Sequence, residues 1–436
     1  MSRPHPSHIL YQNPSQTLTL IDIPHSIEQA QFISSALSSS STTFTDKPCP
    51  RTRKLISCVP LATPYPSLEP KSQKAIKNLP VKDIDDLLLE RYVELSLAEL
   101  REAYGSQKWC LPRVIGEEEK AVEGTRVRKR KRVVGDERGR EDQNLGDTAG
   151  IGVGECVQVH TSPPLPPAEL DISDPTIFSN PNSLPLSISI SKHDSSTTTA
   201  TLPPHSTLLH GPLPQTLSLL PSPPPQFPLI LLDPPWPNRS AHRHASYQTT
   251  PDIQSLLSSL PLQDLLSPNG YIAVWLTNKP AFRSLVLDPG GLFAQWGVRL
   301  VEEWIWVKVT ENGEPVTEVG GRWRRPWEKV VVGRAVGEGC LLTGKDPRGE
   351  EVEGEVKKRV IAGVPDIHSR KPNLRYLFEQ LLGEGMEGYS GMEIFARNLT
   401  AGWWGVGDEV LKFQMEECWA DRDSDGNAGF DVDREL

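Results

Sequence analysis

The segment Asp233-Pro234-Pro235-Trp236 has the residue types best suited to chemistry. Proline has a fixed φ angle and no N–H, so this turn is rigid and presents carbonyl oxygens as acceptors. An exocyclic amine such as adenine N6 has two N–H donors, which the Asp233 carboxylate and the Pro234 carbonyl can accept. This would direct the nitrogen lone pair towards an electrophile, while Trp236 would stack on the base for about 1–3 kcal/mol. The alternative is a plain proline turn after a buried strand.

These four residues follow a short apolar run, Leu229–Leu232, which predicts a buried strand. Similar runs alternate with helix-like segments further on: strands are expected at Tyr271–Leu276, Val301–Val309, Lys329–Val332, Val360–Val364 and Gly391–Phe395, and helices at Ile253–Leu260, Ala281–Leu287 and Asn373–Leu382. This alternation predicts an α/β sheet covered by helices on both faces. Ligands of such sheets bind at the carboxyl ends of the strands, where Asp233 and Phe395 are both expected.

The clearest helix of the N-terminal half is predicted from Asp83 to Tyr104. Its apolar residues recur at near-helical spacing, at Ile84, Leu87, Leu88, Leu95 and Leu100. Asp83 can cap its start, and Gly105 can end it. Because an apolar stripe must pack against another element, we expect this half of the chain to be partly folded.

The composition excludes several classes of protein. The 436 residues include 41 prolines and 33 glycines without a three-residue period, which excludes a collagen-like chain. No stretch approaches ~18 consecutive apolar residues, and the N-terminus lacks the apolar core of a signal peptide, so we expect no membrane association. The six cysteines form no CxxC pair, which argues against a disulfide framework or a structural zinc site, and we expect no metal.

The net charge of −10 is unevenly distributed. Glu416–Leu436 holds eight acids and two arginines, whereas Arg126–Arg132 holds six positive charges in seven residues. A mildly acidic total therefore does not exclude a nucleic-acid partner. The basic run is typical of a nuclear localisation signal or a nucleic-acid tether, and alternatively of a solvated linker. The tail begins like a calcium loop at Asp421, but Val432 stands where that loop needs a glutamate, so we expect a disordered acidic tail.

Five motifs in the C-terminal half resemble those of a known enzyme family: LILLDPPWPNRS, VEEWIWVKVTENGEPV, RRPWE, HSRKP and EIFARNLTAGWWGVGDEVLKFQ. They resemble the eukaryotic N6-adenine methyltransferases of the family named after the 70-kDa subunit of the messenger-RNA methyltransferase, and most of all its methyltransferase-like protein 4 branch. The resemblance covers residues 207–414. It implies a permuted Rossmann-like α/β domain that transfers the methyl group of S-adenosylmethionine to adenine N6.

With this resemblance, the chain divides into four regions. We expect the methyltransferase domain at residues 184–415. A smaller mixed α+β module at 1–110, which would help to grip nucleic acid, precedes it. A mostly flexible, low-complexity linker at 111–183 carries the basic run, and the acidic tail occupies 416–436.

The resemblance also implies roles for single residues on the cofactor side, beyond the catalytic Asp233, Pro234, Pro235 and Trp236. Lys371 would approach the cofactor carboxylate, and Arg397 and Asn398 would hold its ribose. Asp408 and Glu409 would lie beside its adenosine, and Gly211 and Pro212 belong to the loop that would face its adenine.

On the substrate side, the loop after the catalytic motif is rich in donors and cations. Asn238, Arg239 and Tyr247 of this loop would clamp the phosphates beside the target base, or would alternatively form a merely solvated loop. Trp327 and Glu328 would contribute a substrate-side aromatic ring and a carboxylate.

The chain departs from the family pattern at four places. Asp408 stands where relatives have asparagine, Arg370 where they often have histidine, and Pro237 where the similar branch tends to have an acid. The loop His210-Gly211-Pro212 lacks the acid that relatives often place against the cofactor's adenine. We expect these changes to affect cofactor affinity more than catalysis.

The sequence thus predicts a metal-independent adenine N6-methyltransferase acting on nucleic acid. RNA is expected over DNA. The turn from Asp233 to Trp236 would read only the edge of the base, however, and a protein distinguishes the two polymers by contacts to the 2′-hydroxyl. The alternatives are the same reaction on DNA adenine, and a non-catalytic nucleic-acid-binding scaffold of the same fold. We expect a monomer that acts in the nucleus, with the cytoplasm as an alternative location.

Overall fold

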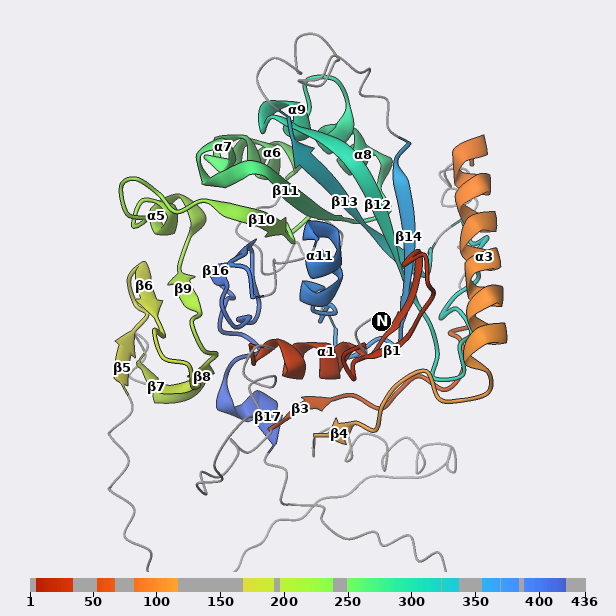
Figure 1. The fold of residues 1–436 in the computed structure, drawn as a ribbon, viewed down its shortest axis with the longest axis horizontal. Coiled ribbons are helices and arrows are strands. Elements are labelled where there is room, and N and C mark those ends of the chain that lie inside the picture. Colours follow the sequence, from red (N-terminus) through yellow and green to blue (C-terminus); the bar gives the residue numbers. More distant parts are fainter. Residues whose placement is uncertain are drawn as a thin grey trace, which may run out of the picture.

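The computed structural model describes residues 5–33, 53–66, 82–116, 168–191, 197–237, 249–322, 324–336, 355–368, 370–383 and 388–420. Its central element is an eleven-stranded mixed sheet (Figure 1). The strand order across the sheet is β1 (Ile9–Gln12), β2 (Leu18–Ile21), β14 (Lys357–Gly363), β12 (Val298–Lys308), β13 (Trp327–Ala335), β11 (Leu266–Leu276), β10 (Phe227–Leu232), β15 (Met392–Ile394), β16 (Trp404–Gly407), β9 (Thr207–His210) and β6 (Thr176–Ser179).

β10 lies inside this sheet and delivers Asp233 to its edge. It pairs in parallel with β11 on one side and with β15 on the other. Its residues Leu229–Leu232 are buried or nearly so, because an inner parallel strand is covered on both faces. After β10 the chain builds the β11 side first and later returns to place β15 and β16 between β10 and β9. The crevice at such a reversal of strand order is where ligands bind in open α/β sheets.

Helices cover both faces of the sheet. On one face, α6 (Thr250–Ser259), α7 (Leu262–Leu265), α8 (Pro280–Leu287) and α9 (Leu292–Gln295) share a core with β10 and β11. On the other face, α11 (Arg375–Leu382) packs Leu377 and Phe378 among the tryptophans of β11 and β12. The expected α/β sheet with a helical cover is therefore confirmed.

The helix α3 (Ile84–Tyr104) begins and ends as predicted. The Asp83 carboxylate accepts the N–H of Asp86, and Gly105 ends the helix with φ +73°. The predicted apolar stripe is wrong at four of its five residues, because Ile84, Leu87, Leu88 and Leu95 are each more than half exposed, and only Leu100 is buried. A second stripe, Leu89, Val93, Leu97 and Leu100, has regular helical spacing and packs against β2 and β14 instead.

The N-terminal segment contributes directly to the central sheet. β2 pairs in parallel with β14, and β1 extends the sheet beyond it. The helix α1 (Ile23–Ala30) follows β2, and β3 (Lys54–Ser57) joins β4 (Val114–Ile115) and β17 (Trp419–Ala420) in a small sheet below it (Figure 1). The described strands of residues 1–110 therefore lie in sheets that they share with later parts of the chain.

The other described strands form a third sheet beside β9. It consists of β5 (Ala168–Asp171), β7 (Leu186–Ser191) and β8 (Thr197–Leu202), and its core continues into residues 396–411. In β7, apolar and polar residues alternate along Leu186–Ser191, and Ile188 and Ile190 are the buried ones. The region 111–183 was predicted to be a mostly flexible linker, but β5 and β6 lie at its C-terminal end. Among the described residues no helix is long and apolar enough to cross a membrane.

Candidate active site

Asp233 stands directly after β10 and lies among cations. Its N–H donates to the carbonyl oxygen of Ile394, 3.2 Å away, which ties the turn to the end of β15. Its carboxylate lies 3.1 Å from the Lys371 ammonium and 3.5 Å from the Arg397 guanidinium. The structure thus brings together three residues that are separated by up to 164 positions in the sequence.

Lys371 connects Asp233 to a second carboxylate. Its ammonium lies 2.8 Å from Glu328 and 4.1 Å from the centre of the Trp275 ring. Burial acts to lower the pKa of Lys371, but Asp233 and Glu328 outweigh it and raise that pKa. Burial acts to raise the pKa of Glu328, but Lys371 and Lys308 outweigh it and lower that pKa to about 2. Both groups are therefore charged at neutral pH.

Arg397 links Asp233 to the predicted cofactor residues at the end of β16. Its guanidinium donates to Glu409 at 2.9 Å, and Lys412 lies 2.7 Å from the same carboxylate. Burial acts to raise the pKa of Glu409, but Lys412 and Arg397 lower it. The pKa of Asp408 is raised by burial, although the nearby His210 acts against this. Asp408 and Glu409 are both exposed at the surface.

Gly211 and Pro212 lie beside Asp408, as the predicted grouping of these residues requires. β9 and β16 are parallel neighbours, and His210 pairs with Gly407, so the two loops leave the sheet together. Gly211 has φ +124°, a conformation that favours glycine. Pro212 is exposed and caps the short helix α5 (Leu213–Leu217).

A cavity opens at this edge of the sheet. Four predicted residues line it, namely Asp233, Lys371, Arg397 and Asn398; the other lining residues are Trp275, Pro372, Asn373, Glu393, Phe395 and Phe413. The sequence had placed Phe395 at a strand end without a role. A phenylalanine at φ +63° is uncommon, and this backbone conformation directs the chain from β15 towards Arg397.

Glu393 is the titratable residue that sequence reasoning missed. It lines the cavity from β15, and its carboxyl forms no hydrogen bond with any residue that the structure describes. Burial raises its pKa to about 8, and the neighbouring charge of Asp233 adds to this effect. The signal in the sequence was a carboxylate in the middle of a short, otherwise apolar strand.

The expectation that Trp236 stacks on a substrate base is wrong for this structure. Its ring is 4% exposed and stacks on Phe282 of α8 with the ring centres 4.7 Å apart. Its indole N–H donates to the carbonyl oxygen of Trp275, 2.6 Å away. Trp236 therefore fixes the Pro234-Pro235 turn from inside the core, because its ring packs on α8 and its N–H is bonded to β11. The Pro234 carbonyl accepts the N–H of Trp236 and keeps its second lone pair.

The expectation that Trp327 contacts the substrate is also wrong for this structure. It is 1% exposed and belongs to the core between the sheet and α3. Successive residues of a strand point to opposite faces, so Glu328 points towards Lys371 while Trp327 points away. Of this predicted substrate pair, only Glu328 reaches the site.

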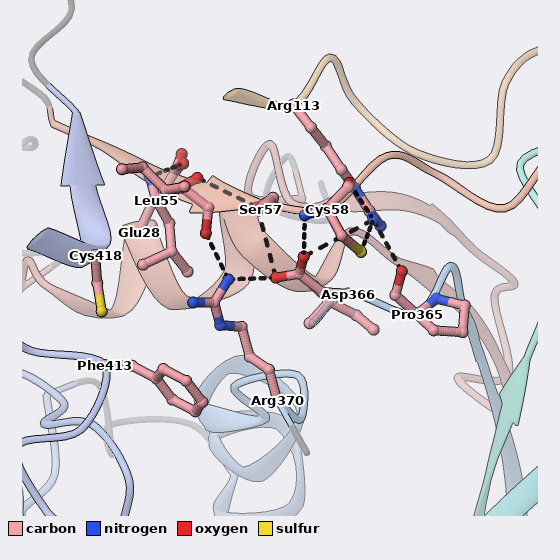
Figure 2. Close-up of polar contacts among 12 residues, drawn as sticks. Glu28, Leu55, Ser57, Cys58, Arg113, Pro365, Asp366, Arg370, Phe413 and Cys418 are labelled. Carbon is pink, nitrogen blue, oxygen red and sulfur yellow. Dashed lines mark hydrogen bonds and ion pairs between the residues drawn. The ribbon is translucent and has the colours of Figure 1, made fainter. Parts of the chain in front are cut away.

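A buried polar network holds the segment before Lys371 (Figure 2). Arg370 donates to Asp366 at 2.6 Å and to the Ile56 carbonyl at 2.8 Å, and its guanidinium lies 4.5 Å from the centre of the Phe413 ring. Asp366 also accepts the N–H of Cys58 at 3.1 Å. Arg370 is therefore a structural residue beneath the cavity, which gives a role to the arginine that departs from the expected family pattern.

Arg113 completes this network from the N-terminal region (Figure 2). It donates to the carbonyl oxygens of Val364 and Pro365 at 2.9 and 2.8 Å, and it lies 3.9 Å from Asp366. The side chains of Arg113, Asp366 and Arg370 are at most 1% exposed. The position of Lys371 thus depends on residues far upstream of the motifs.

Several predicted residues lie outside the described part of the chain. These are Asn238, Arg239 and Tyr247 of the loop after the catalytic motif, the basic run Arg126–Arg132, and the tail from Asp421 onwards. The described part of the chain contains no group of three His, Cys, Asp or Glu side chains placed to hold a metal ion.

Comparison with known proteins gives this geometry a context. Residues 227–409 match the family model MT-A70. The chain is 34% identical to the N6-methyladenosine RNA methyltransferase MTA1 of Cryphonectria parasitica over 95% of this chain and 94% of that protein. It is 33% identical to MTA1 of Pyricularia oryzae over 94% and 96% of the two chains. It is also 32% identical to the human N(6)-adenine-specific methyltransferase METTL4, over 49% of this chain and 43% of that protein.

Proposed function

The chain belongs to the MT-A70 family of adenine N6-methyltransferases, and we propose that it transfers a methyl group from S-adenosylmethionine to adenine N6 in RNA. The observation that carries this proposal is the Asp233 turn at the edge of β10, held beside Lys371 and Arg397. We further propose that the fold is the permuted Rossmann-like form, because the strand order reverses between β10 and β15.

The residues that line the cavity fit this cofactor. Lys371 suits a carboxylate, while Asn398 and Arg397 suit the hydroxyls of a ribose. The Glu393 carboxyl has no hydrogen-bond partner among the described residues and faces the same cavity. Bound S-adenosylmethionine supplies an electrophilic methyl group on a sulfonium sulfur.

The residues of the chain then orient the amine. The Asp233 carboxylate has lone pairs beyond those facing Lys371 and Arg397, and it accepts one N6–H of the adenine. The free lone pair of the Pro234 carbonyl accepts the second. This would orient the N6 lone pair towards the methyl group, whose bond to sulfur would break as the N–C bond forms, leaving the demethylated cofactor. The extra proton would pass from N6 to solvent after the transfer, so no strong general base is required. Trp236 keeps this turn rigid from below rather than contacting the base.

RNA is favoured as the substrate because two relatives that align over almost the whole chain are named as RNA methyltransferases. DNA adenine is the second candidate, since a shorter alignment pairs this chain with a DNA N6-methyl methyltransferase of Caenorhabditis elegans at 28% identity. We propose that the protein acts as a monomer and in the nucleus, the latter because of the basic run Arg126–Arg132.

The test is transfer of a labelled methyl group from S-adenosylmethionine to matched RNA and DNA oligonucleotides, followed by digestion and nucleoside identification. We expect label on N6-methyladenosine from RNA and none with Asp233→Asn, which keeps the size of the side chain but not its charge. The matched control is Asp264→Asn, because Asp264 is an exposed residue of α7 that does not line the cavity. Cofactor binding without transfer to either polymer would support a non-catalytic scaffold instead.

A further inference from the structure

A group of cations lies on the sheet face opposite the cofactor cavity, between α8 and α3. It consists of Arg283, Arg325, Lys329 and Lys358, and we call it the cationic cluster. We propose that the cationic cluster binds phosphates of the single-stranded nucleic acid whose adenine enters the catalytic turn. The inference rests on the proposed function and assigns a substrate-binding site that lies outside the cofactor cavity.

The sheet register places these side chains together. Lys329 on β13 lies opposite Ile305 of β12, so it shares a face with Glu303, two residues along that strand. Lys358 of β14 pairs directly with Glu303 from the other side. Arg283 of α8 donates to the Glu303 carboxylate at 2.7 Å, which fixes the helix over this point.

Arg325 closes the group on the side of α3. It lies 2.6 Å from the Asp86 carboxylate in the first turn of that helix. Its guanidinium also lies 5.7 Å from the centre of the Trp327 ring, which holds it close to β13. The helix α8, the strand β13 with the segment before it, and the strand β14 thus direct four cations to one place.

Two members of the cationic cluster are paired and two are not. Arg283 pairs with Glu303, and Arg325 pairs with Asp86 and also lies near Asp83 and Glu90. The ammonium groups of Lys329 and Lys358 form no ion pair with any residue that the structure describes. Lys329 is the least satisfied member, because its ammonium forms no hydrogen bond with any residue that the structure describes and its side chain is partly buried, whereas Lys358 is exposed to solvent. Burial lowers its pKa, the nearby Glu303 opposes this, and Arg283, Arg325 and Lys358 lower it further. An anion bound here would relieve that repulsion.

The distance from the cationic cluster to the catalytic turn suits a polymer. The Asn278 amide donates to the Trp327 carbonyl, and Lys279 donates to the Pro237 carbonyl, so the starts of β13 and α8 both lie beside the turn. Lys329 is two residues beyond Trp327 on β13, so the two Cα atoms lie about 7 Å apart. Arg283 is about one helical turn beyond Lys279, roughly 5–6 Å along α8.

These positions explain why the ligand should be a nucleic-acid backbone. A nucleic-acid strand whose base occupies the catalytic turn carries its neighbouring phosphates past the edge of the sheet. At this edge Glu328 points towards Lys371, and Lys329 points to the opposite face of the sheet. Arginine and lysine are the side chains that hold phosphates by charge-assisted hydrogen bonds. The position of the cationic cluster beside the catalytic turn favours phosphates of the substrate polymer over an unconnected anion, for which this proximity would have no purpose.

The test is direct binding of a labelled single-stranded RNA oligonucleotide to the full chain at several salt concentrations. Lys329→Met removes the charge and keeps most of the chain length of the side chain, and Lys358→Gln changes an exposed member that cannot disturb the core. We expect each to weaken binding about tenfold at low salt, and to make the slope of log K against log salt shallower by about 0.7, the value for one lost phosphate contact on a single strand. Lys329→Arg keeps the positive charge and should therefore keep both the wild-type affinity for RNA and the wild-type salt slope.

The matched control is Lys108→Met, which removes one exposed positive charge that is paired with Glu311 away from the cationic cluster. Cofactor affinity should be unchanged in every variant. If Lys329→Met and Lys358→Gln bind RNA with the wild-type slope, or if Lys108→Met weakens binding as much as they do, the inference is overturned. Because this assay measures RNA binding, it remains decisive even if the wild type transfers no methyl group, a result that would refute the proposed function alone.

Discussion

The buried network beneath Lys371 predicts that Asp366→Ala is strongly destabilising. Asp366 is fully buried and lies between the equally buried Arg370 and Arg113 (Figure 2). Removing the carboxylate leaves two cations without their acid in the interior. Breaking a buried ion pair from one side typically costs about 3–5 kcal/mol, because the remaining charge is not compensated.

That loss of stability should be visible in thermal unfolding of the full chain. In a domain of 150–250 residues, 1 kcal/mol corresponds to about 2–4 °C, so we expect the midpoint to fall by roughly 6–20 °C. The control is Glu94→Ala, which breaks an exposed pair with Arg91 on α3 at 3.2 Å. Exposed pairs contribute about 0–1 kcal/mol, so that variant should be nearly unchanged.

The same substitution has a second readout at the cavity. Arg370 precedes Lys371 directly and also packs on Phe413, so its release should move two residues that line the cavity. We expect the affinity for S-adenosylmethionine to fall at temperatures where Asp366→Ala is still folded. The reasoning is refuted if Asp366→Ala unfolds within about one degree of Glu94→Ala and binds the cofactor like the wild type.

Three further predictions concern single residues. Trp236→Ala should cost about 3–5 kcal/mol, since the ring is buried against Phe282, whereas Trp236→Phe should lose less; equal unfolding midpoints for the two variants would contradict the packing role. Glu393 has a pKa of about 8 when folded against an ordinary value of 4.5, so the folded state keeps a proton that the unfolded state has released. Stability without ligand should therefore fall as pH rises from about 4.5 to about 8, and Glu393→Gln should flatten that profile in pH-dependent denaturation; an unchanged profile would show that Glu393 is not the cause. Gly313→Ala should cost about 1–3 kcal/mol, because Gly313 has φ +81° and an added Cβ would meet the Trp109 ring; an unfolding midpoint equal to that of the wild type would show that the Trp109 contact yields.

The elements of the C-terminal half could largely be predicted from the sequence. Apolar runs marked β10, β11, β12 and β15, because buried parallel strands need apolar residues on both faces. Capping residues gave the ends of α3, since Asp83 and Gly105 act locally. The face of α3 was not predictable, because two apolar stripes compete and only the position of β2 and β14 selects between them.

Residue types and motif order determined the chemistry of this protein. A carboxylate, two prolines and an indole in one turn, with a lysine and an arginine in their later motifs, specify the family and the reaction without any coordinates. What the tertiary structure decided is which way each side chain points. Trp236 and Trp327 turn into the core, Glu393 joins the cavity, and Arg113 reaches from the N-terminal region to the segment before Lys371. The physical reason is that orientation depends on strand register and on burial against distant segments, which no local pattern encodes.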